Sequence, residues 1–167
     1  MSDSGVSAAT ATANPGDTVL SRLSLELTLL SRHFPATRRN PGCRLDRSAF
    51  LILTRLRLGE PLTLRELAET FKLDISTINR QVGAMLEQGL VDRVPDPEGG
   101  IARKIRPSAK GLELLAGDLA QNHRGLEKVV ADWPAEDVEQ LSRLVERFNE
   151  SVERLEHNPW PRPGRDR

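Results

Sequence analysis

Apolar residues recur every three or four positions in six stretches of the chain, and this spacing predicts amphipathic α-helices. The stretches are bounded by residues that start or stop helices. Thr63 and Glu66 form a capping box, Asp74 is a good N-cap, and Gly89 stands in the C′ position of a helix end. We therefore expect helices at residues 17–34, 46–58, 63–72, 74–88, 108–132 and 138–157.

Between residues 90 and 107 the helical spacing gives way to two short apolar runs. The first run ends at Val94, a Pro-Glu-Gly-Gly turn follows at residues 97–100, and the second run starts at Ile101. Two short strands around a glycine-rich turn predict a β-hairpin. A hairpin placed directly after two short helices indicates a wing.

The predicted helix at residues 74–88 has a short polar face beside its apolar stripe. The stripe is expected to consist of Ile75, Ile78, Val82 and Met85 or Leu86. The outward face then consists of Ser76, Thr77, Asn79, Arg80, Gln81 and Ala84. Arg, Asn and Gln can read base edges in a DNA major groove, and Ser or Thr can bind phosphates. The face therefore favours DNA contact, with Arg80 as the base reader, although any surface helix has a solvated polar face.

The predicted helices at both ends of the chain carry more apolar surface than a small domain needs. The helix at residues 17–34 has leucines on more than one side, and the helix at residues 138–157 has a continuous apolar stripe. We expect these surfaces to pair with a second chain. Residues 17–34 and 108–157 would then be dimerisation helices around a DNA-binding part at residues 45–107.

The expected fold is mainly α with a small β-hairpin wing: a winged helix-turn-helix with N- and C-terminal dimerisation helices, over residues 17–157. Residues 1–16 are rich in Ser, Ala and Thr and are expected to form a disordered tail. Residues 158–167 form a Pro- and Arg-rich tail, in which Trp160 is expected to be exposed or loosely packed.

The composition fits one globular domain and limits its partners. The chain has 167 residues, of which 38% are apolar, and it shows neither a membrane-spanning run nor a signal peptide, so a cytoplasmic location is expected. A single cysteine excludes an internal disulfide. The 24 basic and 24 acidic residues cancel, and residues 62–107 hold seven of each, which predicts no strong non-specific attraction to DNA.

The run LRELAETFKLDISTINRQVGAMLEQGLVDRVPDPEG at residues 64–99, with RKIRPSAKG at residues 103–111, resembles the MarR family of winged-helix transcription regulators. The resemblance extends over about residues 18–156. It implies a homodimer, joined by its terminal helices, that binds a pseudo-palindromic operator with two recognition helices in successive major grooves. Carried over by position, the DNA contacts would come from Ser76, Thr77, Asn79, Arg80, Gln81 and Arg103.

The wing departs from the family pattern at its tip. Where the family commonly has Asp-Arg-Arg, this chain has Gly99, Gly100 and Ile101. Because the family's tip arginine enters the minor groove, we expect this wing to contribute only Arg103 and Lys104, both to phosphates. The two glycines also suit a tight hairpin turn, and we expect both effects together.

Residues 33–44 hold the other candidate sites. Cys43 lies in a basic setting that could lower the pKa of its thiol and make it a redox sensor, although lone cysteines more often pack inertly. The resemblance also implies an effector pocket for a small anionic ligand, for which the alternative is solvated loop charge. The candidate pocket residues are His33, Arg38, Arg39 and Arg44.

The sequence thus predicts a sequence-specific regulator, most simply a repressor, that binds double-stranded DNA as a homodimer and is released by a small-molecule effector. The scattered histidines predict no metal site, and we expect no cofactor and no catalytic cluster. The alternative is a winged-helix dimer that works mainly as a protein-interaction module with weak or no specific DNA binding. The neutral charge of residues 62–107 and the altered wing tip favour that alternative.

Overall fold

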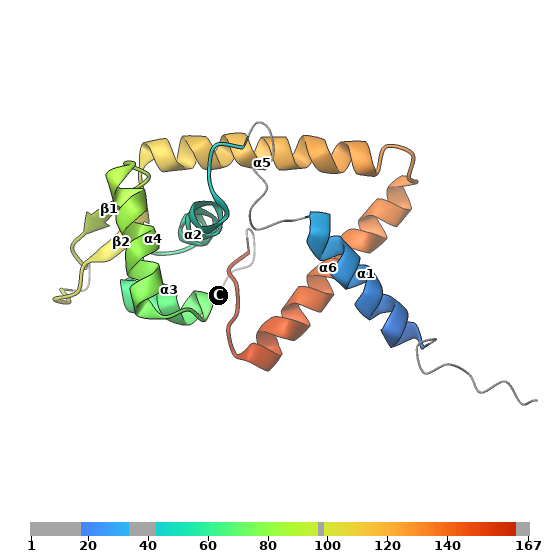
Figure 1. Cartoon of the computed structure of the whole chain (residues 1–167), viewed down its shortest axis with the longest axis horizontal. Helices are drawn as coiled ribbons and strands as arrows, with labels where there is room; N and C mark the ends of the chain where they lie inside the picture. Colours follow the sequence, from blue (N-terminus) through green and yellow to red (C-terminus); the bar gives the residue numbers. More distant parts are fainter. Residues whose placement is uncertain (1–17, 34–42, 97–98, 163–167) are drawn as a thin grey trace, which may run out of the picture. The chain divides into compact units, whose positions relative to one another are not determined.

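A computed structural model of the chain describes residues 18–33, 43–96 and 99–162 (Figure 1). Within these ranges the chain forms α1 (Val19–His33), α2 (Arg47–Arg57), α3 (Leu64–Phe71), α4 (Ile75–Glu87), β1 (Val91–Val94), β2 (Lys104–Pro107), α5 (Ala109–Val129) and α6 (Ala135–Glu156). The predicted mainly α fold with one antiparallel hairpin is confirmed. The tail predicted at residues 1–16 lies outside the described residues.

The chain divides into two compact units, residues 1–38 and residues 39–167, and each is described by itself. The first unit contains α1. Its Leu20, Leu25 and Leu30 are all exposed, although they lie on different sides of the helix. This agrees with the prediction that the first helix carries apolar surface on more than one side.

The core of the second unit is formed by α2, α3, α4, the hairpin and the first half of α5. Each of these elements buries at least one large apolar side chain against the others, so that removal of apolar surface from water holds them together. The most deeply buried examples are Leu53, Leu67, Ile78, Leu90, Ile105 and Leu115.

Local capping bonds fix where α2 and α3 begin. The Thr63 hydroxyl accepts from the Glu66 N–H at 3.2 Å, and the Glu66 carboxylate accepts from the Thr63 N–H at 2.7 Å, so the predicted capping box is formed. Asp46 accepts from the Ala49 N–H at 2.9 Å. Burial alone would raise the pKa of Asp46, but its hydrogen bonds to Ala49 and Ser48 outweigh this and hold the pKa below its usual value.

The prediction that Ile75 belongs to the buried stripe of α4 is wrong. Ile78, Val82 and Met85 are buried as expected, whereas Ile75 is 52% exposed. Ile75 is the first residue of α4 and follows directly on the corner from α3, so it stands beyond the part of the helix that packs on the core.

The hairpin pairs β1 with β2 in an antiparallel register that runs from Val91 opposite Pro107 to Val94 opposite Lys104. Leu62 adds a bridge to Ile105, which attaches the segment before α3 to the wing. Ile101 was expected to start the second strand, and this is wrong. Pairing begins only at Lys104, and Ile101 lies in the tip with its side chain fully exposed.

Helix α5 begins directly after Ser108, whose hydroxyl accepts from the Gly111 N–H at 2.9 Å and so caps the helix. The spacing of Leu112, Leu115 and Leu119 predicts a buried stripe on this helix, and this prediction is only partly correct. Leu115 is buried, but Leu112 is 39% exposed and Leu114 is buried in its place. The buried side of α5 therefore faces slightly to one side of the predicted stripe, and it ends at Leu119.

The prediction that Trp160 is exposed or loosely packed is also wrong. Its ring is partly buried and meets the Phe71 ring edge-on, with centroids 5.6 Å apart. The segment that follows α6 returns to the end of α3 to make this contact (Figure 1).

Candidate nucleic-acid interface

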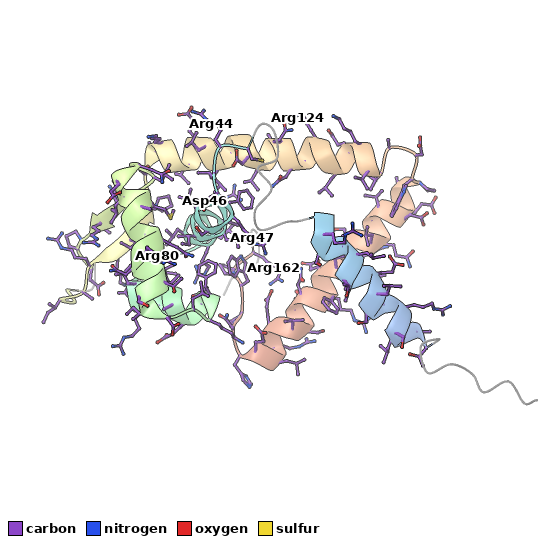
Figure 2. All side chains as sticks on the ribbon, viewed as in Figure 1. Arg44, Asp46, Arg47, Arg80, Arg124 and Arg162 are labelled. Atoms are coloured by element: carbon purple, nitrogen blue, oxygen red, sulfur yellow. The ribbon has the colours of Figure 1, made fainter. Side chains whose placement is uncertain are left out.

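Helix α4 presents its polar face to solvent because its opposite face is anchored in the core. Ser76, Asn79 and Arg80 are exposed, while Thr77 and Gln81 are partly buried at the edges of that face. Figure 2 labels Arg80 on this helix. The structure therefore brings the five predicted contact residues of α4 onto one side of one helix.

The corner between α3 and α4 is held by backbone geometry. Lys72 adopts the left-handed conformation, with a φ of 52°, and its N–H donates to the Glu69 carbonyl oxygen at 3.3 Å. Asp74 is the N-cap residue of α4, as predicted, but its side chain makes no capping hydrogen bond. Instead the Thr77 N–H donates to the Asp74 carbonyl oxygen at 2.9 Å.

The two basic wing residues predicted to bind phosphates have different surroundings. Arg103 is exposed. Lys104 forms an ion pair with Asp96 at 3.0 Å, and both side chains are only 15% exposed. Because Lys104 is largely covered and already neutralised by a carboxylate, it is positioned to hold the wing together more than to reach a phosphate.

Asp96 also explains the glycines at the wing tip. Its carbonyl oxygen accepts from the Gly99 N–H at 3.0 Å, and Gly99 has a φ of +82°, which favours glycine. A Cβ added at Gly100 would collide with the Asp96 side chain. The tip is thus shaped by one aspartate that closes the turn with its backbone and binds Lys104 with its side chain.

A shallow groove runs between the beginning of α3 and the wing, and three arginines line it: Arg65, Arg93 and Arg103. All three are exposed. Arg65 and Arg93 were not predicted as candidates, because neither lies on the recognition helix and nothing in the sequence indicates that the two segments meet.

Cys43 does not have the pKa that its arginine neighbours suggested. Burial raises the pKa of the thiol, and the negative charge of Asp118 raises it further. The basic setting therefore does not lower the pKa of this thiol, because burial and the charge of Asp118 on α5 act in the opposite direction. This weakens the case for redox sensing, which stays a prediction.

We expect iodoacetamide to alkylate Cys43 slowly near neutral pH, and we expect the alkylation rate to rise only in the alkaline range. Only the thiolate attacks, and a raised pKa leaves less thiolate at any given pH. The rate should be compared with that of the same chain unfolded in urea, across a pH series. Faster alkylation of the folded protein than of the unfolded chain at neutral pH would contradict this assignment.

Two of the four candidate effector residues lie within the described part of the chain. Arg38 and Arg39 lie outside the described residues. His33 is the last residue of α1, in the unit of residues 1–38, and Arg44 precedes α2 in the other unit (Figure 2). Arg44 is exposed, and the pocket stays a prediction.

Asp118 is a structural residue that the sequence did not reveal. It is only 2% exposed, and its two carboxyl oxygens accept from the N–H groups of Arg44 at 2.9 Å and Leu45 at 3.0 Å. The sequence does not indicate this role, because the segment that Asp118 binds lies more than 70 residues away in the chain.

Two further findings apply to residues 18–33, 43–96 and 99–162. In these ranges no group of three or more His, Cys, Asp or Glu side chains is arranged to hold a metal ion. No helix there is both long and apolar enough to cross a membrane.

The two short helices α3 and α4, their corner and the hairpin that follows define a winged helix-turn-helix, a class of DNA-binding protein. The sequence profile of the MarR family matches residues 45–99, which span α2 to the wing. The chain belongs to the MarR family of transcriptional regulators.

Three relatives support this assignment. The uncharacterized HTH-type transcriptional regulator YxaD of Bacillus subtilis is 34% identical over 107 residues, which cover 64% of this chain and 75% of YxaD. A second regulator of that organism, YybA, is 26% identical over 110 residues, or 66% and 73% of the two chains. The structure of a MarR family protein from Bacillus stearothermophilus is similar with a TM-score of 0.64 and 26% identity, over 78% of this chain and 96% of that one. YxaD and YybA are both described as HTH-type transcriptional regulators.

Proposed function

We propose that this protein is a homodimer that binds a pseudo-palindromic DNA operator through α4, represses transcription there, and is released by a small-molecule effector. The observation that carries the proposal is the exposed polar face of α4, with Ser76, Asn79 and Arg80 on a helix whose other side is fixed in the core. Such side chains suit base edges and phosphates of a major groove. A regulator of this kind acts in the cytoplasm.

The exposed apolar surface of α6 supports a dimer. This helix buries none of its residues, yet it carries large apolar side chains that are 37% to 82% exposed. They are Leu141, Leu144, Val145, Phe148, Val152 and Leu155. A contiguous apolar stripe of this kind marks an interaction surface, and the family membership makes a second copy of the chain its natural partner.

In the proposed complex the wing contacts only the phosphate backbone of the DNA, because its tip has Gly99, Gly100 and Ile101 where the family has arginines. Arg93 and Arg103 on the wing, with Arg65 on α3 across the groove, would lie near phosphates, whereas Lys104 would hold the wing through Asp96. Fewer neutralised phosphates release fewer counterions. Specificity would then rest mainly on residues 76–81.

The test is fluorescence anisotropy on duplexes from the protein's own promoter region, at two salt concentrations, with a scrambled duplex as control. We expect selective binding and a shallow salt dependence. Arg80→Ala should weaken operator binding by about 1 to 3 kcal/mol per half-site, roughly 5- to 150-fold, because it removes a forked contact to guanine. Arg124→Ala, which removes an exposed arginine from α5 (Figure 2), is the matched control.

Equal operator affinity of Arg80→Ala and Arg124→Ala would refute the assignment of Arg80. The second candidate function is a protein-interaction module, favoured by the seven basic and seven acidic residues that cancel between residues 62 and 107 and by the wing tip without arginine. No binding to any promoter duplex at low salt by a well-folded dimer would favour that function.

A further inference from the structure

The segment that follows α6 is fastened to the end of α3. Asn158 donates from its Nδ2 atom to the Thr70 carbonyl oxygen at 2.7 Å, and the Trp160 ring packs on Phe71 at an interplanar angle of 79°. Thr70 and Phe71 are the last two residues of α3. Both contacts therefore fall beside the corner that leads into the recognition helix α4.

The same segment is also fastened to α6. Arg162 makes a two-pronged contact with Glu153, with nitrogen–oxygen distances of 2.6 and 2.8 Å, and the Trp160 N–H donates to Glu153 at 3.1 Å. The hydrogen bond from Arg162 is the main reason that the pKa of Glu153 lies below its usual value. An ion pair of 3.0 Å between Lys72, at the end of α3, and Glu156 adds a weaker, half-exposed link.

Helix α6 has little else that could fix its direction relative to α4. It buries none of its residues, and the core of this unit is built from α2, α3, α4, the hairpin and α5. The orientation of such a helix depends on what holds its two ends. One end is the turn from α5, and the other is the segment at residues 158–162.

We propose that residues 158–162 act as a positioning strap, which sets the angle between α6 and the recognition helix α4 by binding the end of α3. The proposal rests on the proposed function for its consequence: in a dimer built through α6, that angle sets the spacing of the two recognition helices, and hence the fit to two half-sites. Without the strap, α2 to α5 would swing as one body about the α5–α6 turn, and only a fraction of the molecules would match the operator.

The angle can be measured without DNA. Nitroxide labels are placed at Glu87→Cys on α4 and Arg143→Cys on α6, both exposed positions, in a Cys43→Ser background. Labelled chain is diluted with excess unlabelled chain, so that pulsed electron resonance reports the distance within one chain. We expect a narrow distance distribution in the full-length protein.

Four variants then test the strap. Trp160→Ala and removal of residues 158–167 should broaden the distribution. Trp160→Phe, which keeps a ring against Phe71, and removal of residues 163–167, which leaves the strap in place, should keep it narrow. Circular dichroism confirms that each variant is folded. A broad distribution in the full-length protein, or an unchanged one after removal of residues 158–167, would overturn the proposal.

Operator affinity is then measured on the unlabelled variants. Loss of the strap should weaken operator binding about tenfold, as expected if about a tenth of the molecules keep the competent angle, while each variant remains a dimer in solution. If the full-length protein binds no operator, the proposed function fails, and the distance distributions still decide whether the strap exists.

Discussion

Replacing Gly111 with alanine should destabilise the protein by about 1 to 3 kcal/mol, although alanine stabilises an ordinary helix. A Cβ at this position would collide with the Leu90 carbonyl oxygen and come within 3.1 Å of the Leu53 side chain. The Leu90 carbonyl cannot easily move away, because it accepts a hydrogen bond of 3.0 Å from the Ser108 N–H. Helix α5 would have to shift off the beginning of the wing.

The same helix supplies the controls. A Cβ added at Gly117 or Gly125 meets nothing within 4 Å, so alanine at either position should stabilise the protein by up to about 1 kcal/mol. Urea unfolding followed by circular dichroism measures all three variants, at one protein concentration because a dimer is stabilised by mass action. A Gly111→Ala protein as stable as the other two would show that α5 does not approach Leu90 closely.

Replacing Asp118 with alanine is the second large change that we expect. Its carboxyl oxygens satisfy the N–H groups of Arg44 and Leu45, and the residue is buried. Each N–H group that loses its acceptor away from water costs about 1 to 3 kcal/mol. The variant should therefore unfold at a clearly lower urea concentration, and the segment before α2 should lose protection in hydrogen exchange.

Asp118→Asn separates the lost acceptors from the lost charge. Asparagine keeps one acceptor oxygen, so its stability should lie between those of Asp118→Ala and the wild type. Glu113→Ala, an exposed acidic position on the same helix, should change stability by less than about 0.5 kcal/mol. If Asp118→Ala is as stable as Glu113→Ala, the two hydrogen bonds contribute nothing to the fold.

The candidate interface was predictable from sequence because its signals are local. The capping box at Thr63 depends on residues three positions apart, and the face of α4 follows from the spacing of Ile78, Val82 and Met85. The exposure of Ile75 was not predictable in this way. Periodicity shows which side of a helix is apolar, but it does not show how far the neighbouring elements cover that side.

The surroundings of the other candidates depended on distant segments. Cys43 has arginines beside it in sequence, but in the fold burial and the negative charge of Asp118 raise the pKa of its thiol. The sequence predicts Lys104 as a phosphate ligand, whereas in the fold Lys104 forms an ion pair with Asp96. The sequence does not show which charged side chains form ion pairs in the fold. A side chain that forms such a pair is less available to a ligand.

The sequence by itself determined the order of helices and hairpin, the polar face of the recognition helix and the family to which the chain belongs. These depend on periodicity, caps and turns, which act over a few residues. Only the tertiary structure decided that Gly111 allows α5 to approach Leu90, that Asp118 holds the segment before α2, and that residues 158–162 bind the end of α3. Each of these joins residues far apart in the chain, and such pairs are set by how the elements pack together.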